Sequence, residues 1–258
     1  MRKKGFTLIE LLVVLAIIAL LMGILMPSLV AARQIGRRLV CLSNLRQMVI
    51  AANSYLANNN EYYPLASFVD KSHVADGIQY NGEWDFFKVY QFGEMTECKP
   101  GLLWEADSIL KIQQCPAFKG SANSPGDPFT GYNYNVSFIG GILERAEDGT
   151  LTGVNSTRSI EVQNPAGCVI FGDGEYEDGA NKFMRSPWQG KLETQSDLQL
   201  KPYGTQGFRH LRKTNVAYCD GRAQTLSERF TETHPELVDL IAEGTGFLSD
   251  DNSAYDLK

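Results

Sequence analysis

The sequence predicts an α+β protein in which one long N-terminal helix spans a membrane and then packs on an antiparallel β-sheet. The chain opens with an apolar run from Phe6 to Leu25 that contains a single ionisable residue, Glu10. Apolar residues then recur at helical spacing as far as Leu56, and the last third alternates short apolar runs with turn residues. With 43% hydrophobic and 21% charged residues, the composition is that of a globular domain.

The run from Phe6 to Leu25 is twenty residues long and follows a short basic head that ends at Gly5. As a helix with about 1.5 Å rise per residue it measures roughly 30 Å, the thickness of the hydrocarbon core of a bilayer. A carboxylate within such a span costs about 3 kcal/mol or more unless it finds a partner. Glu10 therefore calls for a specific role.

The residues around this carboxylate are Lys4-Gly5-Phe6-Thr7-Leu8-Ile9-Glu10-Leu11-Leu12-Val13-Val14. This stretch resembles the N-terminus of type IV prepilins and of the pseudopilins of type II secretion. The resemblance implies that a prepilin peptidase cuts between Gly5 and Phe6 and that the new N-terminal Phe6 is N-methylated. A plain membrane anchor would leave Glu10 unexplained. A signal peptide cut after Ala32 would have an apolar region far longer than the usual 7–15 residues.

The same resemblance implies a structural subunit of a type II secretion or type IV pilus-like filament, not an enzyme. Its implied partners are other filament subunits, the prepilin peptidase, an inner-membrane assembly platform and, before assembly, membrane lipid. In the filament, Glu10 of one subunit would meet the Phe6 amine of a neighbour. Because breaking one side of a buried ion pair costs about 3–5 kcal/mol, this contact would set the axial register.

The resemblance also implies a location: a bacterial inner membrane with the N-terminus in the cytoplasm and the globular domain in the periplasm, followed by a periplasmic or cell-surface filament. Gly23 and Pro27 mark a predicted flexible joint, because glycine lacks a side chain and proline lacks a backbone donor. The expected organisation is a leader (1–5), a transmembrane and filament-core helix (6–26), its amphipathic continuation (27–57), a pilin-like globular domain (58–245) and a flexible polar tail (246–258). The apolar face of the continuation comprises Ile35, Leu39, Leu42, Leu45, Val49, Ala52 and Leu56.

The charge and the cysteines limit the possible functions. The net charge is −6, and an acidic chain without a basic stripe argues against nucleic acid as a partner. Five cysteines occur without the Cys/His spacing of a zinc site, so no metal cofactor is expected from them. A Cys41–Cys115 disulfide is the favoured pairing and Cys98–Cys115 the alternative. Five reduced, buried cysteines remain equally open.

The last third contains the clearest strand signals. Tyr132–Asn135 and Cys168–Phe171 are predicted strands, the second ended by Gly172-Asp173-Gly174. Asn215–Cys219 and Arg222–Leu226 form a predicted hairpin around a two-residue Asp220-Gly221 turn. Short helices are expected over 101–110 and from Pro235 to Gly244.

Phe208-Arg209-His210, nine further residues and then Asp220-Gly221 resemble the C-terminal signature of prepilin-like proteins of planctomycete and verrucomicrobial type. Three other stretches fit that group: Cys41–Gln47, Cys115-Pro116 and Pro165–Asp173. Arg222 stands where the group usually has a second histidine, which weakens a His-Asp-His metal site. His210 and Asp220 could also be a catalytic base and its orienting carboxylate, but no nucleophile accompanies them. A structural role for both residues is favoured.

One further feature admits a binding function. The aromatic residues clustered between positions 84 and 104 could form a glycan-binding platform, although a core role is favoured. They would support the alternative function, a membrane-anchored periplasmic binding module. The cluster comprises Trp84, Phe86, Phe87, Tyr90, Phe92 and Trp104.

Calcium is the one cofactor that the pseudopilin resemblance implies, because major pseudopilins bind it near the C-terminal end of the domain. The weak candidates here are Asp173, Glu175, Glu177 and Asp178. They do not follow the EF-hand pattern, and a solvated acidic loop is the favoured interpretation.

Overall fold

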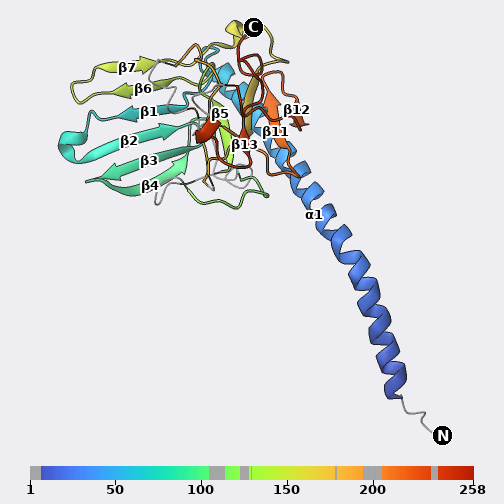
Figure 1. The fold of residues 1–258 in the computed structure, drawn as a ribbon. Helices are drawn as coiled ribbons and strands as arrows, with labels where there is room; N and C mark the ends of the chain where they lie inside the picture. Colours follow the sequence, from blue (N-terminus) through green and yellow to red (C-terminus); the bar gives the residue numbers. More distant parts are fainter. Residues whose placement is uncertain are drawn as a thin grey trace.

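The computed structural model describes residues 7–104, 114–122, 128, 130–177, 179–193, 201, 205–233 and 238–258. Helix α1 (Leu8–Asn58) projects from a β-rich globular part, and the first turn of the helix is the part farthest from it (Figure 1). We call residues 8–40 of the helix the stem, and the described residues from 41 onward the head. The predicted α+β class is confirmed.

Helix α1 runs without interruption for 51 residues, through Gly23 and Pro27. The loosening predicted between these two residues on assembly therefore stays a prediction. The helix ends as expected in the Asn58–Asn60 stretch, where Asn60 and Glu61 take positive φ values of 52° and 64° and turn the chain away. Among the described residues, α1 is long and apolar enough to cross a membrane.

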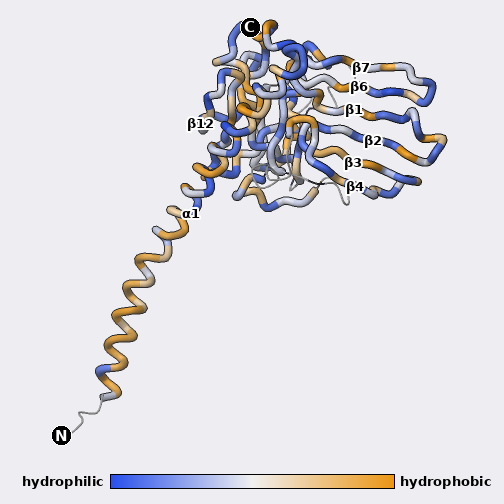
Figure 2. Tube along the Cα trace, turned by 180° about the vertical axis from the view of Figure 1, so that it is seen from behind, coloured by the Kyte–Doolittle hydropathy of each residue, from blue (hydrophilic) through white to orange (hydrophobic). Residues whose placement is uncertain are grey.

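The two parts of α1 differ in burial. The apolar side chains of the stem are exposed, and the hydropathy colouring in Figure 2 is mostly apolar along its outer part, up to the hydrophilic segment RQIGRR at 33–38 next to the head. Burial begins at Cys41, so Ile35 and Leu39 of the predicted apolar face are exposed instead of packed, because the head does not reach them. The buried apolar residues of α1 are Cys41, Leu45, Met48, Val49, Ala52 and Leu56.

The head part of α1 packs on a five-stranded sheet, in which it contacts β11, β12 and β8. The strand order is β12-β11-β8-β5-β9, and β5 and β9 pair in parallel whereas the other neighbours are antiparallel. The strands are β5 (Tyr132–Asn135), β8 (Val169–Asp173), β9 (Phe183–Met184), β11 (Thr214–Tyr218) and β12 (Ala223–Leu226). The predicted strand over 132–135 is therefore found with the same bounds.

A six-stranded sheet extends away from α1 on the far side of the head (Figure 1). Its order is β4-β3-β2-β1-β6-β7, with β1 and β6 parallel, so both large sheets are mixed where an antiparallel sheet was predicted. The strands are β1 (Ser67–Asp70), β2 (Ile78–Glu83), β3 (Phe86–Gln91), β4 (Glu94–Pro100), β6 (Ile142–Arg145) and β7 (Leu151–Val154). A two-stranded ladder joins β10 (Gln206–Gly207) to β13 (Thr245–Gly246).

Trp84, between β2 and β3, joins the two large sheets. It is fully buried, and its indole nitrogen donates to the carbonyl of Lys182 at 3.0 Å. Its ring lies 5.5 Å from that of Phe171 and 5.9 Å from that of Tyr134, both in the five-stranded sheet. The core role favoured for the 84–104 aromatics thus holds for Trp84, as it does for the buried Phe86 and Trp104, whereas Phe92 is 81% exposed.

The turn between β11 and β12 differs from the predicted two-residue turn. The Tyr218 carbonyl accepts from Gly221 N–H at 3.0 Å, and the Arg222 carbonyl accepts from Tyr218 N–H at 2.8 Å, so the loop has three residues. Gly221 occupies the left-handed region with φ of 92°, which a three-residue hairpin loop requires at that position. Asp220 accepts a hydrogen bond from the Arg222 N–H at 2.9 Å and so shapes the turn.

The prediction that residues 246–258 form a flexible tail is wrong. Phe247 and Tyr255 are fully buried, and the carbonyls of Ala254 and Leu257 accept hydrogen bonds from the backbone of residues 169 and 163. Two aromatic anchors thus hold an otherwise polar segment in the core. A helix was predicted from Pro235 to Gly244, and the described part of that stretch forms a short 3₁₀ helix, η5 (Val238–Leu240). Two other short 3₁₀ helices are η1 (Val74–Asp76) and η3 (Ser159–Glu161). Residues 234–237, and most of the helix predicted over 101–110, lie outside the described residues.

Candidate functional site

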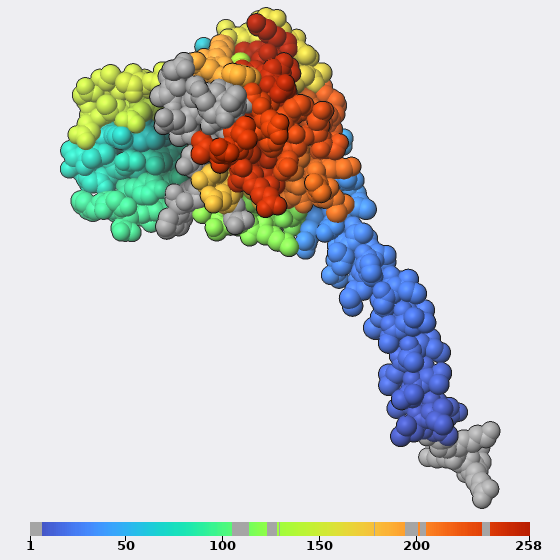
Figure 3. Space-filling model, viewed as in Figure 1, coloured from blue at the N-terminus to red at the C-terminus, as the bar shows by residue number. Residues whose placement is uncertain are grey.

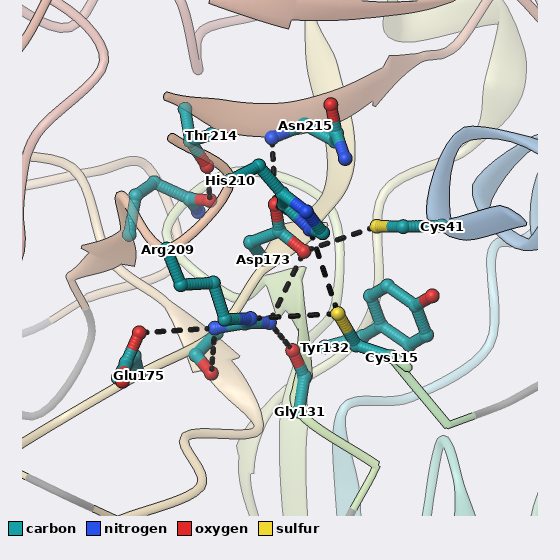
Figure 4. A network of polar contacts seen from close by, with 12 residues as sticks. Cys41, Cys115, Gly131, Tyr132, Asp173, Glu175, Arg209, His210, Thr214 and Asn215 are labelled. Atoms are coloured by element: carbon teal, nitrogen blue, oxygen red, sulfur yellow. Dashed lines mark hydrogen bonds and ion pairs between the residues drawn. The ribbon is translucent and has the colours of Figure 1, made fainter. Parts of the chain in front are cut away.

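Four buried polar side chains converge inside the head, close to where the stem enters it (Figure 4). They are Cys41, Cys115, Asp173 and His210, and their sulfur, carboxylate oxygen and imidazole nitrogen atoms all lie within 4.8 Å of one another. Each comes from a different part of the chain, so the group exists only in the folded head.

Local structure explains why each side chain faces the cluster. Cys41 is the first buried residue of α1, and Asp173 is the last residue of β8. Cys115 is fixed by its backbone N–H, which donates to the Thr130 carbonyl at 2.9 Å. His210 opens a tight turn in which the next two residues take positive φ values of 56° and 62°, and the backbone groups of His210 and Lys213 bond each other.

The contacts within the cluster run through specific atoms. Cys41 Sγ lies 3.2 Å from Asp173 Oδ1, and His210 Nε2 lies 3.3 Å from Asp173 Oδ2. The same Nε2 lies 3.5 Å from Cys115 Sγ. The other ring nitrogen of His210, Nδ1, is buried without a hydrogen-bond partner among the described residues.

Arg209 closes one side of the cluster. Its guanidinium donates to Asp173 Oδ1 at 3.1 Å and to Cys115 Sγ at 3.4 Å, and it pairs with Glu175 at 3.2 Å. It also donates to the Gly131 carbonyl and lies over the ring of Phe118. The second carboxylate oxygen of Asp173 accepts from the backbone N–H of residue 215 at 2.7 Å.

These contacts and burial shift the pKa values of the side chains in the cluster. Burial alone would raise the pKa of Asp173, but the guanidinium of Arg209 and the imidazole of His210 outweigh burial and lower that pKa. Burial opposes the charged form of His210, yet its contacts with Asp173 and Cys115 raise its pKa to about 9. Burial would also raise the pKa of Cys115, but the contacts with Cys41, Arg209 and His210 lower it to about 5. Burial raises the pKa of Cys41.

The arrangement is not that of a catalytic Cys-His-Asp relay. In such a relay the carboxylate orients one ring nitrogen and the nucleophile meets the other. Here Asp173 and Cys115 both face Nε2 of His210, and both are buried. The alternative pairing of His210 with Asp220 is not formed either: His210 contacts Asp173, and Asp220 shapes the hairpin turn, which is the structural role favoured for it.

Two thiols, an imidazole and a carboxylate are instead ligands that zinc-like ions prefer. The donor set does not fit calcium, which takes six to eight oxygen ligands. Asp173 and Glu175 both face Arg209, in place of the predicted open acidic loop, because β8 continues to Asp173 and buries it. Glu177 is exposed, and Asp178 lies outside the described residues.

The structure can be compared with the three arrangements of the cysteines that the sequence left open. The favoured partners, Cys41 and Cys115, lie together but as two free thiols, so their disulfide stays a prediction. Cys98 is exposed on β4 whereas Cys115 is buried in the cluster, so neither the Cys98–Cys115 alternative nor a set of five buried cysteines is found. This group of candidate metal ligands was missed by sequence reasoning because its members are far apart in the sequence. The available signal was the second resemblance, whose four stretches each contribute one of these residues.

Glu10 takes part in the start of α1. Thr7 is the N-cap, and its hydroxyl accepts from the Glu10 N–H at 3.3 Å, while the Glu10 carboxylate accepts from Thr7 N–H at 2.8 Å and from its hydroxyl at 2.7 Å. This capping box satisfies backbone donors that a helix start leaves open. The processing residues Gly5 and Phe6 lie outside the described residues.

Comparison with known proteins identifies the N-terminal segment. The family model described as a prokaryotic N-terminal methylation motif matches residues 1–26. The chain is 48% identical over 59 residues to the type IV wide pilus major component PilA4 of Thermus thermophilus. That alignment covers 23% of this chain and 45% of the relative, so the chain spans less than half the length of the relative. No solved structure matches the chain.

The matched segment is the one that contains the Gly5-Phe6 step, the apolar run and Glu10, and its helical part is the start of the exposed stem. Residues 1–26 of the chain are therefore similar to the prokaryotic N-terminal methylation motif.

Proposed function

We propose that this chain is a pilin- or pseudopilin-like structural subunit of a type IV pilus-like or type II secretion filament. The observation that supports this most directly is the apolar part of the stem, which begins in the methylation motif and runs, exposed, as far as Val30 (Figures 2 and 3). An apolar surface of this size must be covered by lipid or by other protein. Membrane lipid would cover it before assembly, and the stems of neighbouring subunits would cover it in the filament.

Processing would take place at the Gly5-Phe6 bond. A prepilin peptidase would remove residues 1–5, Phe6 would be N-methylated, and an inner-membrane assembly platform would extract the subunit, whose head lies in the periplasm. Thr7 then becomes the second residue of the processed chain. The capping box accordingly places the Glu10 carboxylate one residue from the new amine.

Glu10 would have two successive partners. In the lone subunit its carboxylate is satisfied by Thr7, which lowers the cost of holding it in an apolar helix. In the filament it would meet the Phe6 amine of a neighbouring subunit. An ion pair buried among apolar stems would favour one axial register, since a shifted register leaves both charges unpaired.

Glu10→Gln tests the charge separately from the cap. The amide keeps the size of the side chain and an acceptor for Thr7, but it cannot form an ion pair with the amine. We expect Glu10→Gln to be cleaved normally and to give strongly reduced filament yield in cells that express the assembly machinery. Glu61→Gln, on the head, is the matched control and should assemble as the unmodified chain does. Full filament yield from Glu10→Gln would contradict the register role.

Gly5→Val tests the processing step. A larger residue at the cleavage position should leave the precursor in the membrane with residues 1–5 attached, so no filaments form. A processed chain of normal mass from this variant would contradict cleavage by a prepilin peptidase at Gly5-Phe6.

A further inference from the structure

The four converging side chains have the spacing of metal ligands. Around a tetrahedral zinc ion, sulfur lies about 2.3 Å and nitrogen or oxygen about 2.0 Å from the metal, so neighbouring ligand atoms are about 3.3–3.8 Å apart. In the cluster, His210 Nε2 lies 3.5 Å from Cys115 Sγ and 3.3 Å from Asp173 Oδ2, and Cys41 Sγ lies 3.2 Å from the other oxygen of Asp173, Oδ1. All four atoms lie within 4.8 Å of one another, within about 1 Å of what a single ion requires.

The histidine contributes a second, independent observation. His210 directs Nε2 at both Cys115 and Asp173, although a hydrogen-bonded cluster would be better satisfied by using both ring nitrogens. Convergence of sulfur, nitrogen and oxygen atoms on one point is what coordination of a shared ion requires, and hydrogen bonding does not require it.

The surroundings suit a divalent ion. Two thiolates and the carboxylate carry three negative charges, and Arg209 beside them is shared with Glu175, so a divalent ion offsets most of the negative charge that the four ligands bring together. Arg209 and the backbone N–H of residue 215 hold Cys115 and Asp173 from outside the cluster, as second-sphere donors do in metal sites. Two sulfur ligands select zinc-like ions over calcium or magnesium.

The position of the cluster gives such an ion a structural role. Cys41 is the first buried residue of α1, at the point where the stem meets the head. The other three residues belong to the loop at 114–118, the end of β8 and the turn before β11. One ion bound to all four would join the helix to three separate parts of the head at this junction.

We propose that Cys41, Cys115, Asp173 and His210 bind one zinc-class divalent ion that fixes the stem helix to the head. The site does not depend on the filament function proposed above, because all four ligands belong to one chain. Binding releases to solvent any protons held by the two thiols and by Nε2 of His210, because thiolates, carboxylate and neutral imidazole are the forms that bind an ion. In the absence of the ion the same residues remain as the hydrogen-bonded cluster.

The test is the metal content of the full chain. The protein is produced in zinc-supplemented medium, extracted from membranes in detergent under reducing conditions without chelator, and analysed by inductively coupled plasma mass spectrometry. We expect about one zinc per chain in the unmodified protein and in Cys98→Ser, the matched control at an exposed cysteine. Cobalt substituted for zinc should show tetrahedral absorption bands together with thiolate-to-cobalt charge transfer.

Two variants assign the site. Cys41→Ala should lose the zinc and the cobalt bands. Because a truncated variant could also lose metal by misfolding, His210→Cys supplies a second readout that needs a folded site. It should keep about one metal ion and raise the charge-transfer intensity about 1.5-fold, as two thiolates become three.

Three results would overturn the proposal. One is an unmodified protein with neither zinc nor cobalt bands. Another is a Cys41–Cys115 disulfide found by non-reducing peptide mapping of protein taken directly from cells. The last is full zinc content in Cys41→Ala, or unchanged charge transfer in His210→Cys, which would place the metal elsewhere.

Discussion

Replacing Trp84 tests whether the two large sheets share one core. Trp84 is fully buried between them, and Trp→Ala changes in cores cost about 3–5 kcal/mol of unfolding free energy through lost transfer energy and the cavity left behind. The ring contacts at 5.5 and 5.9 Å and the hydrogen bond to the Lys182 carbonyl place Trp84→Ala at the upper end of this range. Trp84→Phe keeps most of the apolar area and removes only the indole donor. The Lys182 carbonyl still accepts from the Tyr134 N–H at 3.0 Å, so we expect a smaller loss of about 1–2 kcal/mol.

The assay is urea unfolding of the detergent-solubilised full chain, followed by circular dichroism. Phe92→Ala is the aromatic control, because Phe92 is 81% exposed, and it should change stability by no more than about 0.5 kcal/mol. All variants should unfold in one transition of the head. A loss below about 1 kcal/mol for Trp84→Ala would refute the shared core. Separate unfolding of the six-stranded sheet, with the other sheet unaffected, would refute it equally.

Three smaller predictions concern the tail, two glycines and acid stability. Tyr255→Phe should destabilise the head by about 1–3 kcal/mol in the same assay, because it leaves a buried backbone N–H without its 2.7 Å partner; an unchanged midpoint would contradict the buried tail. Gly221→Ala, at φ of 92°, should lower the free energy of unfolding by about 1 kcal/mol or more. Gly36→Ala, in open space on the exposed helix, should raise it by up to about 1 kcal/mol, and equal effects of the two changes would contradict the turn assignment. Hydrogen bonds from Ser72 lower the pKa of Asp70, so its contribution is present above the ordinary aspartate pKa and is lost as the pH falls below it. Asp70→Asn should therefore flatten the loss of stability on acidification, and an unchanged pH profile would contradict this assignment.

Local sequence was sufficient where structure depends on local physics. The apolar run and the helical spacing that follows it predicted α1, which ends in the expected asparagines, and the strand over 132–135 was found with the bounds predicted for it. In both cases the signal lies within one contiguous segment. The buried face of α1 was predicted only in part, since the point where burial begins depends on how far the head extends along the helix.

The tail and the cluster depend on distant partners, which explains why sequence patterns missed them. The tail is polar in composition, and its backbone is held by strands far away in sequence: the Val169 N–H donates to the Ala254 carbonyl, and the Asn135 amide donates to the Tyr255 carbonyl. The cluster joins Cys41 to His210 through Cys115 and Asp173, so no ligand spacing exists to be read. Parallel strand pairs likewise follow from tertiary packing and not from alternation.

The N-terminus of the chain, as it exists in cells with a prepilin peptidase, gives the most direct test of the filament-subunit function. Intact-mass analysis and N-terminal peptide mapping of the membrane-extracted or filament-derived protein give both the cleavage site and any methyl group. We predict a chain that begins at Phe6 and carries one methyl group on its amine. A chain that still begins at Met1, or one that begins at Arg33 after cleavage of a conventional signal peptide, would contradict that function.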